Sequence, residues 1–314
     1  MAKAKEIAGL DCAADALNWA AEVLRVRFDE VVGLRGAALD FSDIEGVHAM
    51  RVATKRLRSA LRDFLPLMSK RPLKRVRKEL KQIADRLGAV RDHDVAIVAL
   101  ERLKDEAEIE LIKAGIEKLL EERSVLREAA RSRLTAALEG GGDFDDLRGR
   151  FAAAIDEAAR RKKSKRTISF NEAGRKAVAD SLRDLIDLGA SLYEPFKTAE
   201  LHEARIAAKR LRYAVELLVH CWGERIAPFA DEIAEMQSFL GEVHDCDVWI
   251  EILGEQLRRR RKNETREVDY QTDIWLLSEF VKKRTKEYRS ALKLWSGWEN
   301  ENFAERMRAM IQSS

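Results

Sequence analysis

The chain has 314 residues, of which 46% are hydrophobic and 36% are charged, and its formal net charge is +3. This length allows one large domain or two smaller ones, each with a sizeable core. Only four prolines interrupt long stretches rich in Ala, Leu, Glu, Lys and Arg, and the alternating pattern of strands is missing, which excludes a β-sheet protein and predicts an all-α fold.

The apolar residues also argue against membrane insertion and secretion. Nowhere do about 18 apolar residues follow one another without interruption. No apolar segment that would serve as a signal peptide follows Lys3 and Lys5. We therefore expect a cytoplasmic protein that makes no membrane contact.

Hydrophobic periodicity predicts five helices in the first half of the chain. Ser42 or Asp43 is expected to cap the second helix. Gly88 is expected to end the third helix in a left-handed conformation, and Asp92 and Asp94 suit the start of a long fourth helix. The predicted ranges are about 11–35, 44–68, 72–87, 92–138 and, after three glycines, 144–160.

The second half repeats this plan, with a terminal helix from Phe303. Its other predicted helices cover about 171–192, 199–222, 224–240 and 247–295, with a break near Asn263 in the last. Each half is therefore predicted to be a helical bundle with short connections. We place the first repeat at 1–162 and the second at 163–314, packed together in a single domain about a pseudo-twofold axis.

Two sequence motifs occur twice in register. The segment VHAMRVATKRLR at 47–58 returns as LHEARIAAKRLR at 201–212, with seven of twelve positions identical. The segment LGAVRDHDV at 87–95 returns as LGEVHDCDV at 240–248. Two echoes with nearly the same offset predict an internal duplication.

The first motif places a row of basic side chains on one side of a helix. Within an arc of roughly 80° lies the first basic stripe, His48, Arg51, Lys55, Arg58 and Arg62. The second basic stripe is shorter, because Glu216 replaces its last cation, and consists of His202, Arg205, Lys209 and Arg212. Stacked cations repel one another, and the first stripe contains no acid, so we interpret it as an anion-binding surface and not as a solvated helix face.

Basic charge is concentrated in the first repeat. From Arg51 to Arg91 there are fourteen Lys and Arg against three Asp and Glu, whereas Arg205 to His244 contains five against six. Arg75 and Lys78 belong to this basic region and are further candidate contacts. We therefore expect most of the bound anion on the first repeat.

The motif His-x-x-Arg-x-x-x-Lys-Arg-Leu-Arg, followed by Leu-Gly-x-x-Arg-Asp-x-Asp-Val, resembles the CHAD family, the conserved histidine α-helical domain. The resemblance implies two four-helix bundles with pseudo-twofold symmetry, whose basic helices face a central pore or groove. It also implies non-catalytic binding of inorganic polyphosphate, with no cofactor. The motif histidines and cations are those of the two stripes, with Arg56 and Arg210 ranked lower because they project away from them. Arg91 matches the arginine of the second motif, and His244 stands in its place in the second copy.

Several alternatives stay open from the sequence. Asp92 and Asp245 suit either a divalent ion or, as we prefer, a helix cap or an orienting partner for arginines, so no metal site is predicted. A nucleic-acid binder would also use a basic groove, although Tyr213 is the single aromatic residue beside the stripes. A phosphotransferase using His48 or His202, and a scaffold that recruits proteins to polyphosphate granules, are the other candidates.

Overall fold

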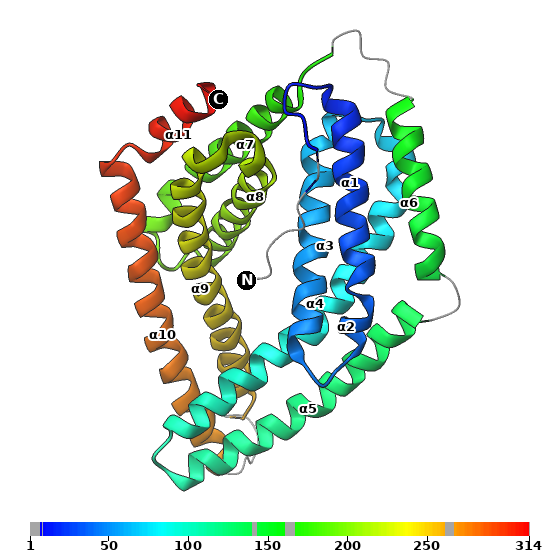
Figure 1. Ribbon diagram of the computed structural model, residues 1–314. Coiled ribbons are helices and arrows are strands. Elements are labelled where there is room, and N and C mark those ends of the chain that lie inside the picture. Colours follow the sequence, from blue (N-terminus) through cyan, green and yellow to red (C-terminus); the bar gives the residue numbers. More distant parts are fainter. Residues whose placement is uncertain (1–6, 8, 140–142, 161–166, 261–266, 314) are drawn as a thin grey trace. The chain divides into compact units, whose positions relative to one another are not determined.

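The protein was analysed as a computed structural model that describes residues 7, 9–139, 143–160, 167–260 and 267–313. Every α-helix within these ranges has a label in Figure 1, and the all-α prediction is confirmed. The helices are α1 Ala16–Gly33, α2 Arg35–Leu39, α3 Ile44–Phe64, α4 Lys70–Glu106, α5 Glu110–Glu139, α6 Asp143–Arg160, α7 Phe170–Asp187, α8 Thr198–Trp222, α9 Ala227–Arg260, α10 Glu267–Asn300 and α11 Phe303–Gln312. Short 3-10 helices occupy Leu65–Leu67, Gly189–Tyr193 and Gly223–Ile226.

The chain divides into two compact units. The first consists of residues 1–99 and 120–174, and the second of residues 100–119 and 175–314. Helices α4 and α5 each contribute residues to both units. Across the ranges that the structure describes, none of the helices combines the length and the apolar character that crossing a bilayer requires.

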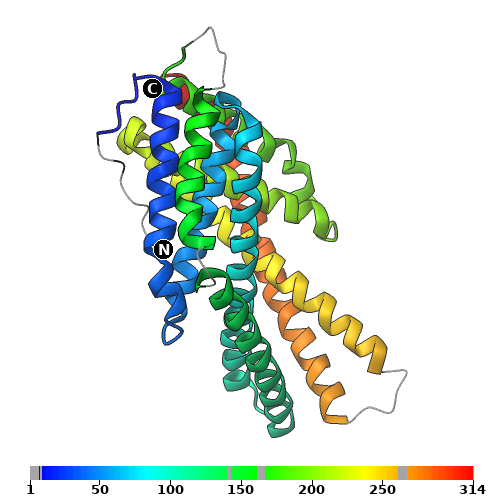
Figure 2. The same cartoon turned by 90° about the vertical axis from the view of Figure 1, so that its right-hand side faces the viewer.

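The first unit is a bundle in which α1, α3, α6 and the first part of α4 run side by side (Figures 1 and 2). Phe28 on α1 stacks on Phe151 of α6 with ring centroids 4.4 Å apart. Phe64 at the end of α3 meets Phe170 at the start of α7 at 5.6 Å. These buried aromatic pairs hold α3 and α6 in the bundle. The other side of α3 is left for charged residues.

The second unit is built around α9, which packs against α8 and α10. Trp249 of α9 stacks on Phe280 of α10, with ring centroids 5.0 Å apart. Gly189 is required beside this bundle, because a Cβ there would lie only 2.2 Å from the ring of Trp295. Aromatic packing therefore anchors this unit as it does the first.

Several predicted helix boundaries are confirmed. Helix α3 begins at Ile44, and the carboxylate of Asp43 caps it by accepting a hydrogen bond from the backbone N–H of Glu45 at 2.8 Å. Helix α8 ends at Trp222, and α11 begins at Phe303. The predicted breaks at the three glycines 140–142 and near Asn263 lie outside the described residues.

The predicted helix end at Gly88 is wrong. Helix α4 continues through Gly88, Asp92 and Asp94 to Glu106, and α9 continues through Gly241 in the same way. The apolar stripe of α4 does not stop at the glycine, since Leu87 and Val90 on either side of it are both fully buried. Burial of two such side chains is worth several kcal/mol, which outweighs the roughly 1 kcal/mol that a glycine costs inside a helix.

The single long helix predicted from 92 to 138 is also wrong. The chain turns at residues 107–109, and α5 returns so that Lys104 forms an ion pair with Glu117. Ala107, Ile112 and Ile116 are buried around this turn. The turn contains neither glycine nor proline, so its position depends on tertiary packing and the local sequence does not reveal it.

Candidate anion-binding site

The first basic stripe lies on α3, and the neighbouring face of this helix is buried as predicted. The apolar side chains of that face are at most 2% exposed, namely Met50, Ala53, Leu57, Leu61 and Phe64. His48, Arg51 and Lys55 are half-buried, whereas Arg58 is exposed. Helix α3 therefore packs on one side and presents the stripe along the border between the packed face and the surface.

Arg51 reaches from α3 to the middle of α4. A Cβ placed on Gly88 would lie 3.9 Å from Arg51 Nε, so the guanidinium lies close against the glycine backbone. Arg51 Nη2 lies 3.4 Å from Oδ1 of Asp92, one helical turn further along α4. The two repeated motifs thus meet here, and Asp92 orients the arginine. The prediction that Asp92 caps a helix is wrong, because it lies in the interior of α4.

His48 lies among cations from both helices. Its Nδ1 atom is buried and has no hydrogen-bond partner within the described part of the chain. Burial lowers the pKa of His48, and the charges of Arg91, Arg51 and Lys55 lower it further, while Glu45 opposes them. We refer to His48, Arg51, Lys55 and Arg91 as the first cation cluster. Burial and the charges of these cations thus both favour the neutral form of the histidine.

An acidic side chain lies beside the far end of the first stripe. Asp63 pairs with Arg62, with Oδ1 2.6 Å from Nη2. The expectation that the stripe has no acidic partners is therefore wrong. Asp63 follows Arg62 in the chain, and Asp92 reaches Arg51 from α4. Arg58 has neither an ion pair nor a hydrogen bond with any residue that the structure describes. Arg58 is therefore the stripe cation most available to a ligand.

The lower-ranked basic residues of the first unit occupy three different environments. Arg56 is 7% exposed, and its Nη1 lies 3.7 Å from Glu30 of α1, so it supports helix packing. Arg75 is exposed and pairs with Glu79 one turn along α4 at 3.0 Å. Lys78 is exposed on the same helix. Arg56 is thus removed from the ligand surface, as its ranking below the stripe suggested.

The second copy repeats the meeting of its two motifs. A Cβ placed on Gly241 of α9 would lie 4.0 Å from Nε of Arg205 on α8. His244, which replaces Arg91, lies with its Nδ1 3.1 Å from Nδ1 of His202. The same helix-to-helix contact therefore forms in the second unit, but a second histidine takes the place of the arginine.

Electrostatics differ between the two copies. Burial lowers the pKa of His244 to about 4, and the charges of Arg205 and His202 contribute to this shift. Burial, Arg205 and Lys209 lower the pKa of His202, whereas Glu203 opposes them. The histidine pair is therefore neutral at pH 7, so the second copy carries less positive charge than the first.

Three other cations of the second copy differ in their exposure. Arg212 is 8% exposed, donates a hydrogen bond to Oε1 of Gln237 at 2.9 Å and lies over the ring of Tyr213. Arg210 is exposed on α8, and Lys209 is half-buried. Arg212 thus has a packing role that its position in the stripe did not indicate, because its counterpart Arg58 is exposed.

In each copy of the second motif, LGAVRDHDV and LGEVHDCDV, the second aspartate interacts with arginine on the following helix. This role was not predicted from the sequence. Asp247 of α9 accepts from Nε of Arg284 on α10 at 2.5 Å. Asp94 of α4 is 1% exposed and lies 3.9 Å from both Arg127 and Arg131 on α5. Asp94 and Asp247 occupy the same position in the two copies of the motif, and this repetition could have indicated the role. Across the described ranges, no group of three or more His, Cys, Asp and Glu is arranged to hold a metal ion.

Known proteins share the sequence pattern and the fold of this chain. The sequence model of the CHAD domain family matches residues 22–254. The CHAD domain from the plant Ricinus communis is 21% identical, with a TM-score of 0.71 over 94% of this chain and 96% of that chain. PptA from Streptomyces chartreusis is 15% identical, with a TM-score of 0.63 over 90% of this chain and 100% of that chain. The search of curated protein sequences gives no significant match.

Proposed function

This chain belongs to the CHAD domain family, as its motifs predicted, and we propose that it binds inorganic polyphosphate without catalysis. The site is the first cation cluster together with the exposed Arg58. A protein of this kind would associate with polyphosphate granules in the cytoplasm, alone or with other granule proteins. Neither a membrane nor a cofactor has a part in this proposal.

One observation carries the proposal, namely the meeting of α3 and α4 at Gly88. The contact brings Arg91 into the field of His48 and places Arg51 against the glycine. Arg91 and Arg58 form no ion pair with any residue in the described ranges. Polyphosphate offers closely spaced negative charges and no bases, so a row of cations provides the recognition that it needs.

The chemistry of the individual side chains suits phosphate. A guanidinium grips two phosphate oxygens in a planar fork, whereas the ammonium of Lys55 acts as an adjustable point charge. Bound phosphate also favours the protonated form of His48, which adds a further charge on binding. Arg51 is already oriented by Asp92, so less conformational entropy is lost when it binds the ligand.

We also propose that the two units are duplicated helical bundles with unequal affinity. The contacts of Arg51 with Gly88 and of Arg205 with Gly241 support a common origin. The second copy is expected to bind more weakly, because neutral His244 replaces Arg91 and because Arg212 is buried against Gln237. Most of the phosphate then lies on the first unit.

The surroundings of the histidines support binding over phosphotransfer. A catalytic histidine is normally oriented by a carboxylate or carbonyl on its other ring nitrogen. His48 Nδ1 has no hydrogen-bond partner in the described structure, and His202 Nδ1 faces His244 instead of an acid. Within the described residues, neither Nδ1 atom thus has the acidic partner that would activate a histidine nucleophile, which favours binding.

Nucleic acid is the less favoured ligand. Single-stranded RNA and DNA are held largely by aromatic side chains on which their bases stack. Tyr213, the one aromatic residue expected near the stripes, is 9% exposed and is covered by Arg212. A base therefore finds no stacking surface at this residue.

A competition experiment tests the proposal. Fluorescently labelled long-chain polyphosphate bound to the protein at moderate salt is challenged with unlabelled polyphosphate, RNA or DNA at equal phosphate concentration. Polyphosphate should displace the label, whereas RNA and DNA should require at least about tenfold more phosphate. Equal displacement by RNA would contradict the proposal. Sustained release of orthophosphate with Mg²⁺, abolished by His48→Gln, would contradict its non-catalytic part.

A further inference from the structure

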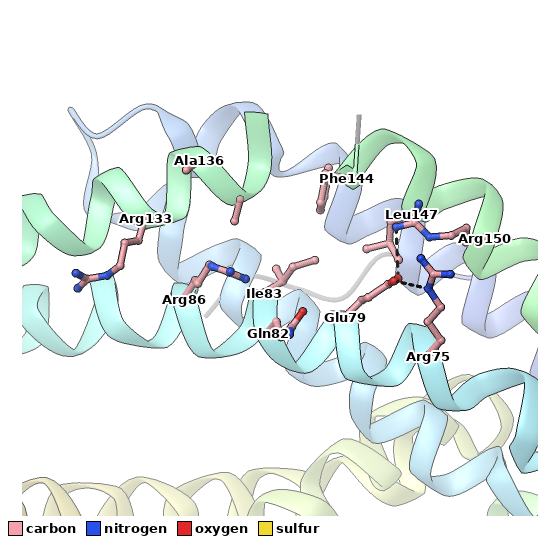
Figure 3. A pocket seen from close by; sticks show the side chains of 11 residues that line it. Arg75, Glu79, Gln82, Ile83, Arg86, Arg133, Ala136, Phe144, Leu147 and Arg150 are labelled. Carbon is pink, nitrogen blue, oxygen red and sulfur yellow. Dashed lines mark hydrogen bonds and ion pairs between the residues drawn. The ribbon is translucent and has the colours of Figure 1, made fainter. Parts of the chain in front are cut away.

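A basic pocket that is distinct from the candidate anion-binding site lies in the first unit, between α4, the end of α5 and α6 (Figure 3). Its volume is about 510 Å³, which lies within the range of pockets that bind small molecules. Four arginines and one glutamate line it, together with Gln82 and several apolar residues. The charged residues are Arg75, Arg86, Arg133, Arg150 and Glu79.

This pocket and the first cation cluster lie on different sides of α4. On a helical wheel the α4 residues of the pocket, from Arg75 to Arg86, fall within an arc of roughly 100°. Gly88 and Arg91 fall on the opposite side of the same helix, where they meet α3. The pocket is therefore separate from the proposed polyphosphate site.

The two ends of the pocket differ in charge. Arg86 extends into the space between α4 and α5, whereas Arg133 of α5 borders the same end with its guanidinium pointing away from that of Arg86 (Figure 3). Both arginines are exposed, and neither forms an ion pair or hydrogen bond with any described residue. This end is suited to a phosphate group, because a free guanidinium binds two phosphate oxygens at once.

At the other end, Glu79 lies between two arginines. Its carboxylate is 3.0 Å from Nε of Arg75 and 3.4 Å from Nη2 of Arg150. Apolar side chains from α6, Phe144 and Leu147, line the pocket beside it. A carboxylate with an unused lone pair accepts from hydroxyl or amine groups, whereas it repels a continuing chain of phosphates.

We propose that this pocket binds a small organic phosphate, with the phosphate on Arg86 at the end that Arg133 borders and a body that carries hydrogen-bond donors toward Glu79 and Gln82. Nucleoside phosphates have this distribution of groups, since their phosphates are at one end and their hydroxyl and amino groups at the other. Inorganic polyphosphate does not, because it has no donors for Glu79. The proposal does not depend on polyphosphate binding at the other side of α4.

Isothermal titration calorimetry at low salt with ATP and with inorganic triphosphate as probes tests the proposal. The pocket should bind ATP more tightly than triphosphate, and the two probes are compared in the Arg51→Gln, Arg91→Gln double variant so that the first cation cluster does not contribute. Arg86→Gln should weaken ATP binding by about tenfold or more, which is the value of one charged hydrogen-bonding group. Lys81→Gln is the matched control, because it removes one exposed cation of α4 outside the pocket, and it should change the affinity by less than about twofold.

A double variant of the cation cluster, Arg51→Gln with Arg91→Gln, separates the two proposals. It should leave ATP affinity within about twofold of wild type, even if it abolishes polyphosphate binding. Three results would each overturn the pocket: no measurable ATP binding, equal losses in Arg86→Gln and Lys81→Gln, or, in the double variant, triphosphate binding as tight as ATP. A large loss of ATP binding in the double variant would place the nucleotide at the cluster instead, which also contradicts the pocket.

Discussion

Arg51 on α3 lies against Gly88 in the interior of α4, so that a Cβ on the glycine would be 3.9 Å from the arginine Nε. Arg205 and Gly241 repeat this relationship at 4.0 Å. Both glycines are helical, since neither has a positive φ. In both copies, an arginine of the first motif thus lies within van der Waals range of the glycine position of the second motif, so the two sequence motifs meet in each half of the chain.

This geometry predicts opposite effects for two glycine-to-alanine changes. Gly88→Ala should stabilise the protein by roughly 0.5–1 kcal/mol, because alanine favours the helix and its Cβ makes only an ordinary contact. Gly46→Ala in α3 should destabilise it by about 1–3 kcal/mol, since that Cβ would lie 1.8 Å from the carbonyl oxygen of Ala37. Urea unfolding curves measure both. Destabilisation by Gly88→Ala equal to that of Gly46→Ala would contradict the 3.9 Å spacing between this Cβ position and Arg51.

Asp94 and Asp247, the second aspartates in the two copies of the second motif, should contribute differently to the free energy of unfolding. Asp247→Asn should cost about 3 kcal/mol, because it breaks a mostly buried ion pair with Arg284 that is 2.5 Å long. Asp94→Asn should cost less. Burial raises the pKa of Asp94, while Arg131 and Arg127, each 3.9 Å away, only partly oppose this effect. Chemical unfolding at pH 7 compares the two variants, and an equal or larger loss in Asp94→Asn would show that this ranking is wrong.

The histidine pair predicts a pH-dependent part of stability. The pKa of His244 is about 4 in the folded protein and 6.5 without the fold, so the unfolded chain binds the proton more readily. Stability from this group is complete above pH 6.5, declines as the pH falls toward 4 and is constant below. The shift corresponds to about 3 kcal/mol as an order of magnitude.

Unfolding free energies at pH 7 and pH 5 check this prediction. The loss between these pH values should be smaller in His244→Gln than in wild type, because glutamine does not titrate. His220→Gln is the control, since His220 is exposed at the end of α8 and has no part in the pair. Identical losses in wild type and His244→Gln would mean that the buried pair does not couple folding to protonation.

Polyphosphate binding should strengthen as the pH falls through the histidine range. The pKa of His48 is lowered in the free protein by burial and by Arg91, Arg51 and Lys55, against Glu45. Bound phosphate raises it, so binding takes up a proton between the two values, and affinity rises by up to about tenfold per pH unit. His48→Gln with His202→Gln should flatten this dependence. A wild type whose affinity does not change with pH would contradict the prediction.

Much of α3 could be predicted from the sequence, whereas its partners could not. Helical periodicity identified the buried face of α3, which contains Leu57, and also the position of the stripe. Both depend only on the spacing of residues along the helix. The contact of Arg51 with Asp92 depends on whether α4 continues past Gly88, and that depends on the burial of Leu87 and Val90 in the folded unit. The contact between Arg51 and Asp92 therefore depends on long-range packing.

The second copy shows the same limit in another form. The replacement of Arg91 by His244 was visible as a change of residue type, and it correctly indicated a weaker positive field. Its contact with His202 was not predicted, because the two histidines are on different helices. Nor did the sequence indicate that Arg212 would be buried while its counterpart Arg58 is exposed.

The central claim is that the first cation cluster and Arg58 hold polyphosphate. The most direct measurement is a titration with long-chain polyphosphate over a range of salt concentrations, comparing wild type with Arg58→Gln, Arg91→Gln and the exposed control Arg183→Gln. Arg58→Gln and Arg91→Gln should each weaken binding and reduce the slope of log affinity against log salt by about one ion, while Arg183→Gln should change neither. Unchanged affinity and slope in both Arg58→Gln and Arg91→Gln, or equal effects of the control, would contradict the claim.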